Sequence, residues 1–264
     1  MTPGLHAEAD GAVLRIRLDR PAKRNALDDA MVAGLIELVA AAGSDESVRA
    51  VLLTGAGEHF CSGADIVARN AGAEGRPRVG SIQRRLPRQA HRLVPVLLET
   101  QTPVVCAVRG WAAGIGLALA LAADVTIAAT DARLWAPYAA RGFTPDGGVT
   151  WLLPRRIGEV RARRMLLLGE RVDGATAAAW GLVERAVPAD EVDAEAAAVA
   201  AALAGGPTVA LGLTKSLLHT GRSAALEAHL RDEAFALELS SRSEDFREGL
   251  GAFREKRPPS FTGR

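Results

Sequence analysis

The fold is decided by the stretch from Thr102 to Thr130, TPVVCAVRGWAAGIGLALALAADVTIAAT. An apolar strand, TPVVCAVRG, leads into a glycine-rich turn, the helix GLALALAAD and a second strand, VTIAAT. A strand, turn, helix and strand in such close succession predict an α/β fold with largely parallel strands. The apolar run is almost long enough to cross a membrane, but Asp124 lies inside it and small residues gain little from lipid. We therefore expect a buried helix and no membrane contact.

The segments on either side support the same class. VRAVLLTG, residues 48–55, is typical of a buried strand, and AVLRIRLDRP, residues 12–21, alternates apolar and polar residues as an early strand does. Between them, ALDDAMVAGLIELVAAAG places apolar residues at helical spacing. Beyond Gly147 the sequence becomes helical. We predict an α/β core over residues 1–200 and a helical region over residues 201–264.

Composition excludes several classes of function. The 32 Lys and Arg residues almost balance the 31 Asp and Glu residues, so no overall field attracts nucleic acid or an anionic membrane. The two cysteines, Cys61 and Cys106, lie far apart and the first residues have no apolar leader, which favours a cytoplasmic setting. The five histidines lack metal-ligand spacing, and neither a phosphate-binding loop nor a dinucleotide fingerprint is present. We expect no metal.

Two glycine-containing turns each follow an apolar strand: CSGADI, residues 61–66, and RGWAAGIGLALA, residues 109–120. Such turns can present backbone N–H groups that converge on one oxygen as an oxyanion hole. They are also compatible with ordinary tight turns whose glycines only permit unusual dihedrals, which spacing alone favours. Spacing alone leaves both interpretations open.

Six segments together resemble the enoyl-CoA hydratase/isomerase (crotonase) family, in the family's order along nearly the whole chain. They are LDRPAKRNAL, HFCSGADI, GWAAGIGLALALAADVTIA, PDGGVTWLLPRRIG, GLVERAVP and EDFREGLGAFREKRPPSF. The resemblance implies a fold of repeated ββα units around an acyl-CoA thioester, with C-terminal helices that build a homotrimer or a dimer of trimers. It implies no separate cofactor, since coenzyme A is part of the substrate.

The resemblance also assigns the binding residues. The two oxyanion-hole donors correspond to the N–H groups of Ala64 and of Ile115, beside Gly114. Lys23 and Arg24 correspond to contacts with the phosphates of coenzyme A, although an ordinary charged turn explains them as well. The further residues assigned to substrate or coenzyme A by motif position are Ala26, Asp65, Ile66, Val67, Tyr138 and Lys256, the last reaching the coenzyme A of a neighbouring subunit. Asp65 also has a structural interpretation as a turn-forming residue.

The chemistry follows from which acids are present. Hydratases of the family use two glutamates, whose positions here hold Ala118 and Tyr138. A methyl group and a phenol with an ordinary pKa of about 10 cannot replace two carboxylates as acid and base. Asp146 resembles the single acid of the family's ring-epoxide and enoyl-CoA isomerases. We therefore predict an enoyl-CoA isomerase with Asp146 as its base, the alternatives being a hydratase or a catalytically silent acyl-CoA binder.

Two alternatives stay open at this point, a structural role for Asp146 and a different function for the protein. Asp146 precedes GGVTWLL, so it is also a good residue to cap the N-terminus of a helix, where its carboxylate would accept backbone N–H groups. The arginine-rich stretches GRPRVGSIQRRLPRQAHR and PRRIGEVRARR allow RNA binding, as in some relatives of the family. Near-zero net charge and the lack of aromatic residues interleaved with these arginines make it a minor alternative.

Overall fold

The computed structural model describes residues 2–65 and 78–264 and contains two sheets. The main sheet has six strands in the order β1-β2-β3-β4-β6-β9. Only β1 and β2 pair antiparallel, and every other neighbouring pair is parallel. The bounds are β1 Leu5–Asp10, β2 Val13–Leu18, β3 Ala50–Gly55, β4 Val104–Val108, β6 Val125–Ala129 and β9 Arg185–Val187. The prediction of largely parallel strands is confirmed.

A smaller sheet has three strands in the order β5-β7-β8, and its first strand lies in the glycine-rich turn. Its strands are β5 Trp111–Ala113, β7 Arg133–Trp135 and β8 Arg171–Asp173. β5 pairs parallel with β7, and β7 antiparallel with β8. The chain that leaves β4 therefore changes sheets at the glycine-rich turn, within the stretch from Thr102 to Thr130.

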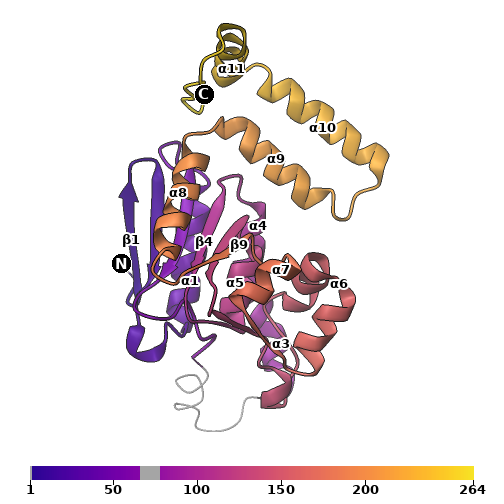
Figure 1. The fold of residues 1–264 in the computed structure, drawn as a ribbon. Helices are drawn as coiled ribbons and strands as arrows, with labels where there is room; N and C mark the ends of the chain where they lie inside the picture. The colour runs from indigo at the N-terminus through magenta and orange to yellow at the C-terminus, as the bar shows by residue number, and fades with distance from the viewer. Residues whose placement is uncertain (1, 66–77) are drawn as a thin grey trace.

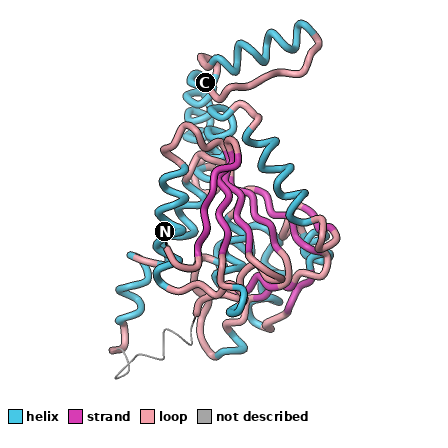
Figure 2. The backbone as a smooth tube through the Cα atoms, turned by 90° about the vertical axis from the view of Figure 1, so that its left-hand side faces the viewer, coloured by secondary structure: helices cyan, strands magenta, loops and turns pink. Residues whose placement is uncertain are grey.

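Helices lie on both faces of the main sheet (Figure 2). α8, Val192–Ala204, packs against β3, β4 and β6, while α5, Ile115–Ala122, packs against β4. All eight residues of α5 are buried, as expected for its apolar, small-residue sequence. The other helices near the core are α1 Asp29–Ala42, α3 Ser81–Arg85, α4 Leu93–Glu99, α6 Val149–Leu167 and α7 Gly174–Trp180, with short 3₁₀ turns at Pro21–Lys23, Leu86–Arg88, Ala90–Arg92 and Ala139–Arg141.

No helix in the described ranges is by itself long and apolar enough to cross a membrane. Taken together, α8 and α9 have the length and composition, but they meet at a bend of 108°. In α8, small residues on one side of the helix are buried instead against the sheet, including Ala196 and Ala200.

The C-terminal helices α9 Thr208–Thr220, α10 Leu226–Ser240 and α11 Glu244–Glu255 extend away from the sheets, with α9 and α10 forming a hairpin (Figure 1). The predicted division at residue 200 falls inside α8, which still packs on the main sheet. α10 and α11 expose several large apolar side chains, namely Leu226, Leu230, Phe235, Leu237, Leu239, Phe246, Leu250 and Phe253. This apolar surface is unpaired within the described part of one chain.

Candidate active site

The two glycine-containing turns meet in space. Cys61 pairs with Ala112 and Ala64 with Leu27 as isolated bridges, which fixes the first turn between the second turn and the chain before α1. A Cβ atom added to Gly114 would lie 3.8 Å from the Cα of Gly63. Both glycines have positive φ, 57° at Gly114 and 108° at Gly63, which side chains rarely allow. The glycines thus let two backbone segments approach each other closely.

Each turn presents an N–H group that has no acceptor among the described residues. None of the hydrogen bonds between those residues uses the N–H of Ala64 or of Ile115. Ile115 is the first residue of α5, where an N–H has no acceptor within the helix and the helix dipole adds positive potential. Adjacent unpaired donors are what a developing oxyanion requires. The assignment of this pair to a substrate oxygen stays a prediction.

Asp146, Tyr138 and Ala118 lie around the second turn. A Cβ atom on Gly147 would lie 3.7 Å from the Cβ of Ala118 and 3.9 Å from Cγ1 of Ile115. The Tyr138 hydroxyl donates to the backbone carbonyl of Asp146 over 3.3 Å. The fold therefore brings the one acid of the PDGG motif next to the two positions at which hydratases of the family carry glutamates.

Tyr138 is held as a neutral phenol. Its side chain is buried, with Phe143 packed edge-on at 5.5 Å between ring centroids. Burial raises the pKa of Tyr138 well above its ordinary value of 10.0, and the neighbouring negative charge of Asp146 raises it further. The phenol can therefore donate a hydrogen bond at neutral pH but cannot act as a base.

Asp146 does not cap a helix, so that interpretation of the sequence is wrong. The N-cap of α6 is Gly148, and no side chain accepts a hydrogen bond there. Gly147 and Gly148 both adopt left-handed backbone conformations, with φ of 64° and 83°, and the helix begins only at Val149. Two glycines thus separate the half-buried Asp146 from the first turn of α6.

The AKRNAL segment forms a tight turn beside the candidate donor at Ala64. Asn25 is fully buried; its amide donates to the carbonyls of Ala56 and His59 over 2.9 and 2.6 Å. Arg24 and Asn25 have φ of 50° and 55°, and the carbonyl of Arg24 accepts from the Ser62 N–H. Asn25 was not predicted as a site residue from the sequence. Asparagine after charged residues in a turn was the available signal, because it tolerates left-handed backbone.

The carboxylate of Asp65 forms ion pairs with cationic side chains of the same chain. This carboxylate, which is almost fully buried, lies 3.0 Å from Lys23 Nζ and 3.0 Å from Arg20 Nη2. Arg20 also donates to the carbonyl of Ala26 over 2.8 Å and was missed at the sequence level. This network supports the turn-forming role of Asp65. Lys23, whose side chain is 53% exposed, and the exposed Arg24 lie at the surface of this turn, where a phosphate could reach them.

The structure does not assign three predicted binding residues to this site. Ile66 and Val67 are not among the described residues. Lys256 is exposed at the C-terminal end of α11, which lies beyond α9 and α10 from the sheets (Figure 1). Its predicted contact is with a neighbouring subunit, and that contact stays a prediction.

An apolar cavity of about 340 Å³ lies beside Gly147 and Gly148. Its apolar walls come from α4 and from Trp151 of α6, and its polar margin comes from His91, Glu99 and His219. Within the described ranges, no group of three or more His, Cys, Asp or Glu side chains could hold a metal ion. The site thus consists of backbone donors, one carboxylate, one phenol and an adjoining apolar space.

Comparison with known proteins gives a consistent result. A family model described as enoyl-CoA hydratase/isomerase matches residues 8–264. The 1,2-epoxyphenylacetyl-CoA isomerase of Escherichia coli K12 is 38% identical over 98% of this chain and 98% of its own. The 2,3-dehydroadipyl-CoA hydratase of the same organism is 34% identical over 96% of both chains. The crystal structure of an enoyl-CoA hydratase from Bacillus anthracis superposes with a TM-score of 0.91 at 32% identity, covering 99% of this chain and 100% of that one.

Proposed function

The chain belongs to the enoyl-CoA hydratase/isomerase family, and we propose that its reaction is the shift of a double bond in an enoyl-CoA thioester, with Asp146 as the single base. The Asp146 carboxylate removes a proton from C2 of a 3-enoyl-CoA. The resulting dienolate places its charge on the thioester oxygen, which the N–H groups of Ala64 and Ile115 stabilise. Asp146 then returns the proton to C4, giving the 2-enoyl-CoA with no net change in atoms.

The observation that carries this proposal is the identity of the three side chains around the second turn. Ala118 has no proton to give or take, and Tyr138 is a buried, neutral phenol. Asp146 is therefore the acid–base group of this cluster, and it is not used as a helix cap. A 1,3-proton transfer needs one carboxylate, whereas adding water in the manner of the two-glutamate hydratases needs two. Each backbone donor is expected to contribute about 3–4 kcal/mol to the transition state.

The relatives support the family and carry both kinds of name, one being an isomerase and another a hydratase. Hydration is accordingly the second candidate reaction. It would require Asp146 to activate the water while Tyr138 positions it, because the Tyr138 hydroxyl donates to the Asp146 carbonyl and the next residue, Gly147, lies against Ala118.

We extend the proposal to substrate binding and assembly. Lys23 and Arg24 would contact the phosphates of coenzyme A at the mouth of the Ala64 turn. The exposed apolar side chains of α10 and α11 would be buried between subunits of a homotrimer or a dimer of trimers. Lys256, at the end of α11, would then reach the coenzyme A of a neighbour.

The decisive experiment compares 3-enoyl-CoA and 2-enoyl-CoA substrates with wild type, Asp146→Asn and the control Asp131→Asn, which changes an exposed carboxylate. We expect Asp146→Asn to lower the isomerisation kcat at least about a hundredfold, the usual effect of losing a general base. The control should match wild type. Equal isomerisation by Asp146→Asn and wild type would exclude the role of Asp146. Rapid hydration of 2-enoyl-CoA without isomerisation would favour the second candidate.

A further inference from the structure

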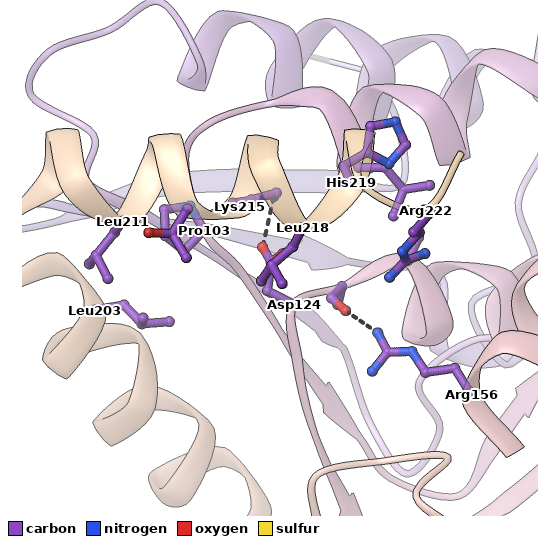
Figure 3. Close-up of a pocket in the computed structure, with 13 residues that line it drawn as sticks. Pro103, Asp124, Arg156, Leu203, Leu211, Lys215, Leu218, His219 and Arg222 are labelled. Atoms are coloured by element: carbon purple, nitrogen blue, oxygen red, sulfur yellow. Dashed lines mark hydrogen bonds and ion pairs between the residues drawn. The ribbon is translucent and has the colours of Figure 1, made fainter. Parts of the chain in front are cut away.

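A second cavity, of about 410 Å³, lies between α9 and the core (Figure 3). Its polar lining comes from three separate parts of the chain and consists of Asp124, Arg156, Thr214, Lys215, His219 and Arg222. Leucines from α4, α8 and α9 line the rest, together with Pro103, Ala122 and Ala123. None of these polar residues takes part in the proposed proton transfer.

The charges in this cavity do not balance. Lys215 and Asp124 neutralise each other, with Nζ 2.7 Å from Oδ2, and Lys215 also donates to the carbonyl of Thr102 over 3.1 Å. Neither Arg156 nor Arg222 forms an ion pair with a carboxylate in the part of the chain that the structure describes. Two guanidinium groups therefore line one cavity in which the one acid among the described lining residues, Asp124, also acts on Arg156 but is already paired with Lys215 (Figure 3).

Arg156 is partly used by the fold, but not fully. Its Nη2 donates to the carbonyls of Leu121 and Ala123 at the C-terminal end of α5, over 2.9 and 2.8 Å. No hydrogen bond to another described residue uses its Nε or Nη1. Burial lowers the pKa of Arg156, and the nearby charge of Arg222 lowers it further. Two like charges held this close create a positive potential that an anion would relieve.

An imidazole adds an independent sign of a ligand. Nδ1 of His219 is buried and has no hydrogen-bond partner in the described ranges. Buried polar atoms are nearly always paired, so an unpaired atom on a residue that lines a cavity is consistent with a missing partner. His219 lines this cavity and also the apolar cavity beside Gly147.

The two cavities are neighbours. Leu98 and His219 line both of them, and the Arg222 guanidinium lies 5.3 Å from the ring of Trp151, which lines the apolar one. Along α6, Gly148 and Arg156 are separated by eight residues, or about 12 Å at 1.5 Å per residue. An extended carbon chain with bonds of about 1.5 Å covers that distance in about ten bonds. A medium-length acyl chain that starts beside Asp146 would thus end near the arginines.

We propose that this enzyme takes acyl-CoA thioesters whose acyl chain ends in a carboxylate, and that Arg156 and Arg222 bind that carboxylate while His219 donates a hydrogen bond. The inference rests on the proposed acyl-CoA function and names its substrate class, the thioesters of medium-chain dicarboxylic acids. Guanidinium groups suit a carboxylate because their N–H donors match its planar geometry. The apolar walls between Gly147 and Leu98 suit the methylene chain that precedes it.

The test measures binding, so that it does not depend on the reaction. Calorimetry compares decanoyl-CoA with sebacyl-CoA, its analogue ending in a carboxylate, on the purified full-length protein. We expect wild type to bind sebacyl-CoA at least tenfold more tightly. Arg222→Gln should remove most of that preference. Arg155→Gln is the matched control, because Arg155 also stacks on Trp151, at 4.1 Å, but does not line the cavity.

The outcomes separate the two proposals. If wild type binds decanoyl-CoA and sebacyl-CoA equally, the carboxylate site is wrong and the acyl-CoA function stands. If neither thioester binds, the proposed function fails and the inference with it. If Arg155→Gln loses the preference as fully as Arg222→Gln does, a general surface charge and not this cavity selects the carboxylate. Because Arg156 also holds the end of α5, Arg222→Gln and His219→Gln are the informative variants.

Discussion

Gly114→Ala separates the geometric role of the second turn from its role in stability. Gly114 has φ of 57° and ψ of −120°, a conformation that residues with a side chain adopt only under strain. The added methyl would lie 3.8 Å from the Cα of Gly63, 3.9 Å from the Tyr138 hydroxyl and 4.0 Å from Cγ of Pro137. These are ordinary contact distances, so the effect comes from the backbone and not from a clash. We expect a loss of about 1–3 kcal/mol in the free energy of unfolding.

The same substitution should impair catalysis for a separate reason. The direction of the Ile115 N–H depends on ψ of Gly114, because that angle rotates the peptide group between the two residues. If the strained backbone relaxes toward an allowed conformation, the donor turns away from the position it shares with Ala64. Loss of one oxyanion donor lowers kcat by about 10²–10³.

Gly158→Ala is the matched control. Gly158 also has a backbone conformation reserved for glycine, with φ of 74° and ψ of 163°, but an added Cβ would meet no atom within 4 Å. It lies at the kink of α6, ten residues beyond Gly148 in the chain. Gly158→Ala should therefore lose a similar 1–3 kcal/mol, about the cost of a strained residue, and keep its kcat.

The assays are urea unfolding followed by circular dichroism and steady-state isomerisation of a 3-enoyl-CoA. If Gly114→Ala and Gly158→Ala are destabilised equally and both retain the wild-type kcat, the Ile115 N–H is not an oxyanion donor held by this turn. If Gly114→Ala is as stable as wild type, the turn tolerates a side chain and does not hold the donor in a fixed direction.

Three further outcomes are expected. Asp124→Ala should lower the free energy of unfolding in urea by about 2–4 kcal/mol, because it leaves the buried ammonium of Lys215 without its acid; the low side of the usual range applies since Asp124 is partly exposed. Burial lowers the pKa of Lys215 from its ordinary 10.5, so the unfolded chain binds more protons just below pH 10.5. Wild type should therefore gain stability as pH rises through that window, relative to Lys215→Met, and a falling difference would contradict this. Tyr138→Phe removes the hydroxyl that donates to the Asp146 carbonyl and should lower kcat by up to about tenfold, while an unchanged kcat would mean that Tyr138 only packs.

Local pattern was sufficient for the main elements of the core. The apolar runs of β3, β4 and β6 and the small-residue sequence of α5 predict buried parallel strands and a buried helix, because burial on every side demands continuous apolar sequence. The segment from Ser81 to Glu99 is not one helix: α3 and α4 are separated by two 3₁₀ turns, the first of which contains Pro87. The glycines of CSGADI and GWAAGIG likewise mark the two turns that meet.

Tertiary structure decided what the polar side chains do. Asp146 satisfies the local rule for a helix cap, yet the left-handed conformations of Gly147 and Gly148 delay the helix to Val149. Arginines and aromatic residues do not alternate along the sequence. In the fold, arginines nevertheless stack on aromatic rings, as Arg171 does on Trp135 with Cζ 4.6 Å from the ring centroid. The arginine and the tryptophan of such a pair come from different helices or strands. The sequence periodicities of helices and strands, 3.6 and 2 residues, therefore do not predict the pairing.

The apolar core and the turns could be predicted from the order of residues along the chain, and the motifs also predicted the family and Asp146 as the acid of the PDGG position. The tertiary structure alone assigned Asn25 and Arg20 to the turn at Ala64, and gathered Arg156, His219 and Arg222 into one cavity. The physical reason is that the pattern of apolar residues along the chain indicates which surfaces are buried, whereas hydrogen bonds form only between groups a few ångströms apart. Which polar groups come that close is known only once the chain has folded.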